Sequence, residues 1–354
     1  SSSTTWTMAD SGGHCITLEN VKEAAERIKG MANRTPVLTS DFFNEGDKKL
    51  FFKVEAMQRT GSFKFRGALN ATKCELAQTT GSHLSIVTHS SGNHAQAVAL
   101  AAKVASTEAR PVTATIVMPS NAPEIKQAGV RRFGGNIVLV ANTNEAREEG
   151  AERIMKETGA SFIHPSEDPR VIAGQGTASL ELLEQLREIG CEKPDAVIIP
   201  VGGGGLASGN AVALRGMLGD KVKIILAEPA KLDDAKRSFD SGTLLQHAPD
   251  NKLDSVADGL KTTLGPNTWP VVRDLVDDIF TVSERDILRH TKCIWEQLKV
   301  CIEPSAGVGV AVARGDAFNE KYRPEDGIQN VAVILCGGNV DIIATTKKME
   351  EHGL

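Results

Sequence analysis

Short apolar runs alternate along this chain with longer amphipathic runs in which hydrophobic positions recur every three to four residues. The apolar runs, rich in Val, Ile and Leu, predict β-strands over residues 50–54, 85–88, 113–118, 136–139, 196–200, 223–227 and 331–335. The amphipathic runs predict helices over residues 18–31 (capped by Thr17), 93–104, 145–158, 177–189 and 284–300. Strands that alternate with helices are typical of parallel sheets covered by helices on both faces. The pattern therefore predicts an α/β protein.

Composition narrows the class of protein. The 354 residues suffice for two domains or one large α/β unit, and 41% hydrophobic with 24% charged residues is typical of a globular protein. No apolar run approaches the ~20 residues of a membrane span. The net charge of −5 and the lack of a basic stripe argue against nucleic acid as a partner.

Cysteine usage points to a reducing compartment. Six cysteines are scattered without a Cys-x-x-Cys pair, which is typical of free thiols in an intracellular protein and predicts a cytoplasmic location. The Ser/Thr-rich stretch at residues 1–7 carries no apolar core and no basic residue, and its origin stays open.

A lysine in an unusual setting is the first candidate for chemistry. The motif Ser62-Phe-Lys64-Phe-Arg66-Gly places an amine between two aromatic residues and next to a cation. Apolar surroundings and a nearby positive charge both lower the pKa of an amine. We therefore expect Phe63, Phe65 and Arg66 to favour a neutral, reactive Lys64. A solvated surface lysine is the alternative interpretation of this motif alone.

Two further motifs point to a phosphate-bearing cofactor. The polar loop Thr88-His-Ser-Ser-Gly-Asn-His94 and the glycine loop Gly202-Gly-Gly-Gly-Leu206 each follow a predicted strand. Glycines at the start of a helix let several backbone amides bind one phosphate dianion. An amine, a Ser/Asn loop and a phosphate loop together meet the needs of pyridoxal phosphate.

The glycine loop has rival interpretations. Gly202-x-Gly204-x-x-Ala207 also fits the dinucleotide motif, and Glu228 follows the next predicted strand at about the expected distance. A nicotinamide-dependent (NAD) oxidoreductase, however, needs neither the lysine motif nor the Ser/Asn loop. A catalytically silent binding protein of the same fold is expected to have lost the lysine, and Lys64 is present.

At these motifs, and from about residue 15 to about residue 343, the sequence resembles the serine racemase and serine/threonine dehydratase family of fold-type II pyridoxal-phosphate enzymes. Further matching motifs are Arg34-Thr-Pro-Val-Leu-Thr-Ser40, Ile172-Ala-Gly-Gln-Gly-Thr177, Ala257-Asp-Gly259, Ile302-Glu-Pro304 and Cys336-Gly-Gly-Asn-Val-Asp341. The resemblance implies a fold of the tryptophan synthase β type, with two open, twisted, mostly parallel sheets flanked by helices. It also implies a small domain at 85–163 inserted into a large one at 1–84 and 164–354, with the active site between them.

The resemblance assigns roles to individual residues. Lys64 is implied to bind the cofactor covalently and to act as the base at Cα, with Ser91 as the second acid/base on the opposite face. The residues implied to hold the cofactor are Phe63, Asn93, Gly202, Gly203, Gly204, Gly205, Leu206 and Cys336. Those implied around the substrate carboxylate are Ser90, Ser91, His94, Arg147 and Thr262. A turn residue is the alternative for Ser91, and a solvated helix residue for Arg147; if Arg147 faces the site, it extends the substrate range to 3-hydroxyaspartate.

Cys336 departs from the usual family pattern. Serine racemases usually carry Ser beside the pyridine nitrogen, whereas some serine dehydratases carry Cys. A neutral thiol is a weak donor, so the cofactor should be a weak electron sink, which favours elimination over racemisation. A core cysteine without a role is the alternative.

Two regulatory sites are also implied by the resemblance. Glu228, the Leu232 carbonyl and Asp234 match a divalent-cation site, and two carboxylates with a carbonyl and waters suit Mg²⁺ or Ca²⁺. Arg59, Thr60 and Gln96 fall where animal racemases bind ATP, although Arg59 replaces the usual lysine.

The residues and the resemblance together predict a cytoplasmic, homodimeric pyridoxal-phosphate enzyme. It is expected to racemise L-serine to D-serine and to convert serine into pyruvate and ammonia. The alternative is a dehydratase that acts mainly on L-threonine or threo-3-hydroxyaspartate. Neither a membrane nor a nucleic acid is expected as a partner.

Overall fold

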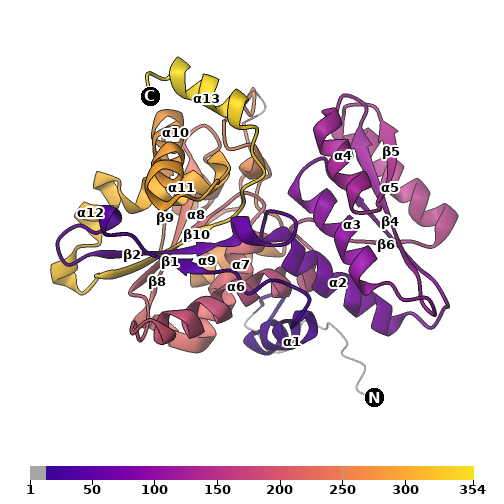
Figure 1. Cartoon of the computed structure of the whole chain (residues 1–354), viewed down its shortest axis with the longest axis horizontal. Helices are drawn as coiled ribbons and strands as arrows, with labels where there is room; N and C mark the ends of the chain where they lie inside the picture. The colour runs from indigo at the N-terminus through magenta and orange to yellow at the C-terminus, as the bar shows by residue number, and fades with distance from the viewer. Residues whose placement is uncertain (1–12, 249) are drawn as a thin grey trace.

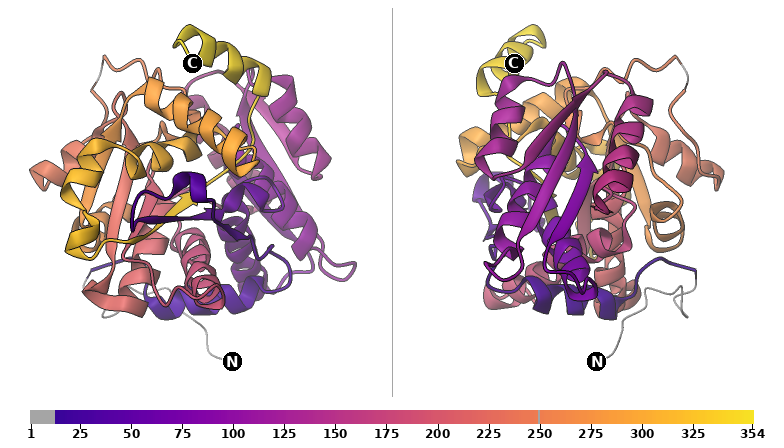
Figure 2. Two further views of the ribbon diagram at one scale, coloured as in Figure 1. Left: turned by 60° about the vertical axis from the view of Figure 1, so that its left-hand side comes forward. Right: turned by 90° about the vertical axis from the view of Figure 1, so that its right-hand side faces the viewer.

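Two β-sheets, each in a lobe of its own, organise the part of the chain that the computed structural model describes, residues 13–248 and 250–354 (Figure 1). The Ser/Thr-rich stretch at residues 1–7 lies outside the described residues. The smaller lobe, magenta in Figure 1, is formed by the middle of the first half of the chain, and the larger lobe contains segments from both sides of it. Figure 2 shows the two lobes from two further directions, with the smaller sheet in front in its right-hand view.

The larger sheet has six strands in the order β1-β2-β10-β7-β8-β9. Its strands are β1 (Val37–Leu38), β2 (Lys49–Val54), β7 (Ala196–Pro200), β8 (Lys223–Pro229), β9 (Asp278–Val282) and β10 (Asn330–Leu335). All neighbours in the sheet run parallel except the short β1, which pairs antiparallel with β2. Because the central strands are buried on both faces, they read as continuous apolar runs.

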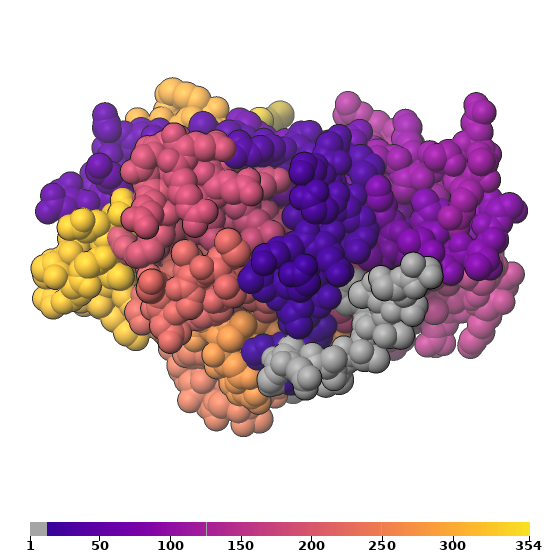
Figure 3. Space-filling view, turned by 90° about the horizontal axis from the view of Figure 1, so that it is seen from below, coloured from indigo at the N-terminus to yellow at the C-terminus, as the bar shows by residue number. Residues whose placement is uncertain are grey.

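Helices cover both faces of the larger sheet. The helices of this lobe are α1 (Leu18–Ile28), α6 (Pro169–Glu188), α7 (Gly205–Leu218), α8 (Asp234–Ser241), α9 (Thr268–Leu275), α10 (Glu284–Cys293), α11 (Pro304–Ala313), α12 (Asp316–Lys321) and α13 (Ile342–Glu351). Helix α1 packs on α6 and α7, and α9 packs on α7. On the other side, α10 packs on α11, which contacts β7, β8, β9 and β10. Seen from below in Figure 3, the indigo N-terminal segment that includes α1 lies beside the pink segment that contains α6.

Short helical turns connect several of these elements. They are the 3₁₀ turns η1 (Asp41–Phe43), η2 (Glu55–Met57), η3 (Gly219–Lys221), η4 (Asp258–Leu260) and η6 (Pro324–Asp326), and the π-helical turn η5 (Ile294–Leu298). Among them, η2 matters most for the site because it continues β2 directly.

The smaller sheet has four parallel strands in the order β5-β4-β3-β6. Its elements are β3 (Leu84–His89), β4 (Val112–Pro119), β5 (Asn136–Val140), β6 (Ser161–Phe162), α3 (Asn93–Ala105), α4 (Glu124–Arg132) and α5 (Asn144–Thr158). Ile86 and Ile116 face a core shared with α3, whereas Val87 and Val117 face α5. Helix α2 (Lys64–Gln78) adds Phe65 to the first of these cores and also packs on α6, so it contacts both lobes.

The predicted strands agree well with the structure. Each of the seven predicted runs is a strand, and β1, β6 and β9 are additional, two of them only two residues long. The elements of the smaller lobe fall between residues 84 and 162, while the domain limits of 85 and 163 themselves stay a prediction. No helix among the described residues is long and apolar enough to cross a membrane, and all six cysteines are free.

Helix limits were harder to predict. Thr17 caps α1 as expected, through a capping box with Asn20, but α1 ends at Ile28. Helix α6 begins eight residues before the predicted start, at Pro169. Its glycines are close-packing positions and not breaks, because a Cβ on Gly174 would lie 2.6 Å from the Gly67 Cα. The predicted helix at 284–300 changes to the π-helical η5 after Cys293.

Candidate active site

The candidate site lies where the carboxyl ends of strands from both sheets meet. The glycine loop follows β7 and Cys336 follows β10, while Ser90 follows β3 and Pro165 lies shortly after β6. The segments are joined by contacts: Lys64 Nζ donates to the Pro165 carbonyl at 2.8 Å, and the Phe63 N–H donates to the Cys336 carbonyl at 3.0 Å. Open α/β sheets bind ligands at this edge of their strands.

Lys64 is the first residue of α2 and is half-buried. Burial lowers the pKa of its amine to about 8, although the nearby Cys336 and Glu303 act in the opposite direction. The amine lies 5.1 Å from the centre of the Phe63 ring. The expected contribution of Arg66 was wrong, because its charge is held by Glu55 and Glu181 and burial is what lowers the Lys64 pKa.

The glycine loop fits a phosphate group. Gly204 has a φ of +81°, a conformation that favours glycine, and α7 begins at the next residue without a side-chain cap. The first backbone N–H groups of a helix have no acceptor within the helix, so those near Gly205 and Leu206 are free to bind an anion. Side chains are excluded here, since a Cβ on Gly203 would lie 2.6 Å from Ser166 Oγ and a Cβ on Gly202 2.9 Å from the Leu260 Cα.

Asn93 begins α3 and connects the two lobes. Its amide nitrogen donates to both carboxylate oxygens of Glu303, at 3.0 and 3.2 Å, and its oxygen accepts from Asn339 Nδ2 at 2.8 Å. Burial raises the pKa of Glu303, only 5% exposed, to about 7. Sequence reasoning had given Glu303 no role. The only signal was a carboxylate set between Ile302 and Pro304, just before a helix of small and apolar residues.

Cys336 lies at the end of β10 and is 3% exposed. Burial, together with the charge of Glu303, raises the pKa of its thiol well above the ordinary value. The thiol is therefore neutral at physiological pH. This matches the weak donor expected from the sequence.

Ser90 and Ser91 lie in the loop between β3 and α3, and both are half-buried. The Ser90 hydroxyl accepts the Gly92 N–H at 3.2 Å, which fixes this loop. Gly92 precedes α3 and provides no side-chain cap, so the loop carries free backbone N–H groups beside Ser91.

Two histidines beside the site are neutral. His94 is 2% exposed, and its pKa is lowered well below the usual value by burial and by the charge of Lys64. Its Nε2 meets the Ile163 carbonyl at 3.0 Å, while its Nδ1 has no hydrogen-bond partner among the described residues. His164, which sequence reasoning missed, accepts the N–H groups of Ser166 and Glu167 on Nδ1 at 3.2 and 2.9 Å. Burial lowers the His164 pKa to about 4.

The two remaining predicted substrate residues, Arg147 and Thr262, lie on different segments of the chain. Arg147 donates to the Thr143 carbonyl at 3.2 Å and to the Asn144 side chain. Its positive charge, after burial, contributes to lowering the pKa of His89. Thr262 is exposed, and its methyl group would lie 3.3 Å from a Cβ on Gly203. Contact of either residue with substrate stays a prediction.

The predicted cation site contains two buried carboxylates close together. Glu228 accepts the N–H groups of Ala235 and Lys236 at 2.9 Å each, and burial followed by the charge of Asp234 raises its pKa to about 9. Burial raises the Asp234 pKa to about 6, against the effect of His247, whose Nδ1 is 3.4 Å away. No group of three or more His, Cys, Asp or Glu in residues 13–248 and 250–354 is arranged to hold a metal. The predicted set has only two such side chains, with the Leu232 carbonyl, and a divalent cation would relieve their repulsion.

Two of the predicted nucleotide residues, Arg59 and Thr60, lie in the turn after η2, and the third, Gln96, lies on α3. Arg59 donates to the Met31 carbonyl at 2.9 Å and stacks over the Phe65 ring at 5.4 Å. Thr60 is 3% exposed, and its hydroxyl has no hydrogen-bond partner among the described residues. Gln96 lies on α3 beside Gly129.

Comparisons with known proteins agree with this geometry. The family model of the pyridoxal-phosphate dependent enzymes matches residues 28–337. Serine racemase of Rattus norvegicus is 42% identical over 333 residues, 93% of this chain and 95% of that protein. A solved structure of maize serine racemase has a TM-score of 0.84 at 41% identity, covering 95% of this chain and 97% of that one. A solved structure of the threonine deaminase of T.th. has a TM-score of 0.80 at 39% identity, covering 92% and 99%. These matches favour pyridoxal phosphate over a dinucleotide at the glycine loop.

Proposed function

This chain belongs to the pyridoxal-phosphate-dependent enzymes and, within them, to the serine racemases, and from that premise we propose that it interconverts L- and D-serine and also converts serine into pyruvate and ammonia. One observation carries the proposal. The half-buried Lys64 amine, with a pKa lowered to about 8, lies at the strand ends that also carry the glycine loop and the Ser90–Ser91 loop.

The residues present fit the cofactor. Lys64 would hold it covalently, and the N–H groups from Gly202 to Leu206 would bind its phosphate at the uncapped start of α7. Phe63, Asn93 and Cys336 would contact its ring. When bound, pyridoxal phosphate withdraws electrons from the substrate Cα, so that the Cα proton can leave.

Lys64 supplies the base for that proton. At pH 7.5, roughly a quarter of amines with a pKa near 8 are neutral, against about one in a thousand at the ordinary value of 10.5. Burial of Lys64 therefore makes a reactive base available at neutral pH. Racemisation needs a second group that returns a proton from the opposite face, and Ser91 is proposed for it. The Ser90 hydroxyl fixes the loop by accepting the Gly92 N–H. In this proposal Ser91, and not Ser90, is therefore the second acid/base.

Dehydration is the competing reaction, and Cys336 supports it. The neutral Cys336 thiol would be a weak hydrogen-bond donor to the ring of a bound cofactor, and such a weak donor would favour elimination over racemisation. The alternative function is therefore a dehydratase that acts mainly on L-threonine or threo-3-hydroxyaspartate. Arg147 would bind the second carboxylate of the latter if its side chain turned toward the site.

The test compares wild type with Ser91→Ala, both loaded with pyridoxal phosphate and Mg²⁺ and given L-serine. D-serine is followed by chiral chromatography, and pyruvate is measured in the same sample. D-serine from wild type that is lost in Ser91→Ala, while pyruvate persists, supports two opposed acid/bases. Pyruvate alone from both proteins would make Ser91 a binding residue and would favour the dehydratase.

We also propose a divalent cation, Mg²⁺ or Ca²⁺, held by Glu228, the Leu232 carbonyl and Asp234. The raised pKa values of the two buried carboxylates support it, because a cation would favour their charged forms. Mg²⁺ should raise the thermal midpoint of wild type by several degrees and leave that of Asp234→Asn within about one degree. Equal shifts in both proteins would contradict this site.

The remaining proposals are ATP binding by Arg59, Thr60 and Gln96, assembly as a homodimer and a cytoplasmic location. The free Thr60 hydroxyl supports the first. Sedimentation of the loaded protein with and without ATP tests the first two. ATP that does not sediment with the protein would contradict ATP binding, and a protein that sediments as a monomer would contradict the homodimer. Fractionation of the source cells tests the third.

A further inference from the structure

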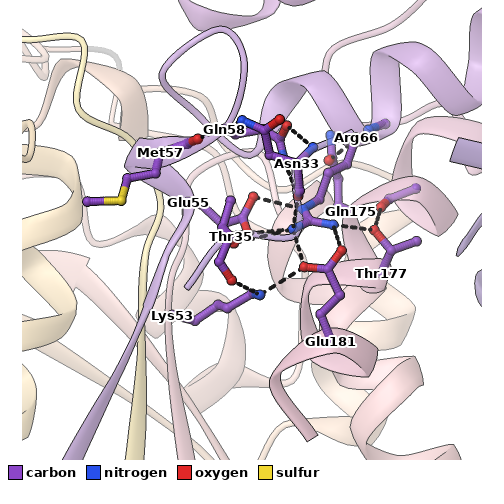
Figure 4. Close-up of polar contacts among 12 residues, drawn as sticks. Asn33, Thr35, Lys53, Glu55, Met57, Gln58, Arg66, Gln175, Thr177 and Glu181 are labelled. Carbon is purple, nitrogen blue, oxygen red and sulfur yellow. Dashed lines mark hydrogen bonds and ion pairs between the residues drawn. The ribbon is translucent and has the colours of Figure 1, made fainter. Parts of the chain in front are cut away.

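Four charged residues, three of them fully buried, form a cluster at the first turn of α2, the helix that begins with Lys64 (Figure 4). We call Lys53, Glu55, Arg66 and Glu181 the Arg66 cluster. The side chains of the first three are fully buried, and that of Glu181 is 22% exposed. Two cations face two carboxylates, so the cluster carries no net charge.

Arg66 uses every one of its N–H groups. Nε and Nη2 donate to the two oxygens of Glu55, both at 2.8 Å, and Nη1 and Nη2 donate to those of Glu181 at 2.8 and 2.7 Å. The fifth N–H donates to Thr177 Oγ1 at 3.2 Å. The guanidinium thus makes two bidentate pairs at once. An ammonium group cannot reproduce this geometry.

The other members are equally well satisfied. Lys53 Nζ donates to Glu181 Oε2 at 2.9 Å, to the Thr35 carbonyl at 2.8 Å and to Gln185 Oε1 at 2.7 Å. The Thr35 hydroxyl donates to Glu55 at 2.5 Å. A buried polar network with all its members paired holds its elements in one arrangement.

The cluster bonds the first turn of α2, a helix that packs on both lobes, to two elements of the larger lobe. Glu55 lies in η2 after β2 and Glu181 lies on α6, both in the larger lobe. Arg66 follows Lys64 by two residues in the first turn of α2, whereas Phe65 on the same turn packs into the core of the smaller lobe. Helix α2 packs both on α3 of the smaller lobe and on α6 of the larger one, and the Arg66 cluster bonds its first turn to the larger lobe. The Gly67 N–H adds a further bond to the larger lobe, to Gln175 Oε1 at 3.0 Å.

We infer that Arg66 is a positioning residue for Lys64. By fixing the first turn of α2 on the larger lobe, the cluster holds the Lys64 amine in one direction relative to the glycine loop and Cys336. Because the Arg66 side chain is fully buried and all its N–H groups have partners within the protein, we expect it to contact neither the cofactor nor the substrate. The inference rests on the proposed function, in which Lys64 holds the cofactor.

The test uses Arg66→Lys, which keeps the charge and loses the two bidentate pairs. Lys48→Met is the control, because Lys48 is another buried cation, 5% exposed, and lies outside the Arg66 cluster. Its Nζ donates to the Tyr322 carbonyl at 3.2 Å. Should Arg66→Lys fail to fold, the double variant Glu55→Gln/Arg66→Met replaces it, since it removes one charge of each sign and keeps the Lys53–Glu181 pair.

Three readouts are taken on loaded protein: hydrogen exchange of the peptide over residues 63–67, the pH titration of the visible cofactor band, and kcat with KM for serine. We expect Arg66→Lys to exchange about tenfold faster in this peptide, to move the midpoint of the titration by about half a unit or more, and to lose about tenfold in kcat with KM within about twofold. Lys48→Met should lower the thermal midpoint and leave all three readouts at the wild-type values.

A lowered thermal midpoint for Arg66→Lys, with the exchange, the titration and kcat of wild type, would overturn the inference and make Arg66 an ordinary stabilising residue. Failure of the proposed function looks different, because wild type would then show no visible cofactor band. In that case the hydrogen exchange of residues 63–67 still decides whether Arg66 fixes the turn.

Discussion

Glu303→Gln should change how stability depends on pH. Glu303 is a buried carboxyl whose pKa is raised by burial from 4.5 to about 7. The folded protein therefore prefers the protonated form, so the contribution of Glu303 is fully present below pH 4.5 and is lost as pH rises through 7. A shift of this size corresponds to about 3 kcal/mol in total, of which about 2 kcal/mol is lost between pH 5.0 and 7.5. Glutamine is neutral at every pH and keeps an oxygen for Asn93 Nδ2.

The assay is urea unfolding of cofactor-free wild type and Glu303→Gln at pH 5.0 and 7.5. The stability of the variant relative to wild type should rise by about 2 kcal/mol between the two pH values. The control is Glu26→Gln, a carboxylate 75% exposed, for which the relative stability should stay within about 0.5 kcal/mol. A constant difference between wild type and Glu303→Gln, or one that falls with pH, would refute a raised pKa at this position.

Three further predictions address the residues around the cofactor site. Cys336→Ser replaces a weak donor by a hydroxyl, and a hydrogen bond worth about 1 kcal/mol should raise the ratio of D-serine to pyruvate about fivefold by chiral chromatography; an unchanged ratio would show that the thiol does not limit racemisation. Gly204→Ala puts a side chain at a φ of +81° with its Cβ 2.7 Å from the Thr268 Cβ. The free energy of unfolding in urea should fall by at least about 1–2 kcal/mol, and cofactor should bind more weakly. A wild-type affinity for the cofactor would exclude the loop as the phosphate site. His164→Asn keeps a polar group but loses the fixed acceptor for the Ser166 N–H. It should lower cofactor affinity, measured by fluorescence titration, without changing the hydrogen exchange of residues 63–67. Faster exchange in that peptide would show that His164 affects more than the Ser166 segment.

Much of the fold follows from local patterns in the sequence. The strands were predicted because buried parallel strands such as β7 and β10 are short, almost wholly apolar runs rich in Val and Ile. Several helices containing glycine were missed or shortened, α6 among them, although α5 was predicted despite Gly150. Glycine lowers helix propensity, yet Gly174 and Gly176 are needed where α6 touches α2 and α7, and that contact is tertiary.

The site was predictable only where its parts are local motifs. Lys64 and the glycine loop each stand in one short segment, so their chemistry could be inferred from the sequence. Glu303 could not, because its partner Asn93 lies 210 residues away. Arg66 shows the same limit: next to Lys64 in sequence it reads as a charge that lowers the lysine pKa, but in the structure it is neutralised by carboxylates from η2 and α6.

Covalent attachment of the cofactor to Lys64 tests the account most directly. Loaded wild type is reduced with borohydride, digested and mapped by mass spectrometry, with Lys64→Ala treated in parallel. The account predicts a pyridoxyl phosphate adduct on Lys64, loss of the visible cofactor band on reduction, and neither the band nor the adduct in Lys64→Ala. An adduct on another lysine, or no adduct in a wild-type protein that has bound pyridoxal phosphate, would contradict it.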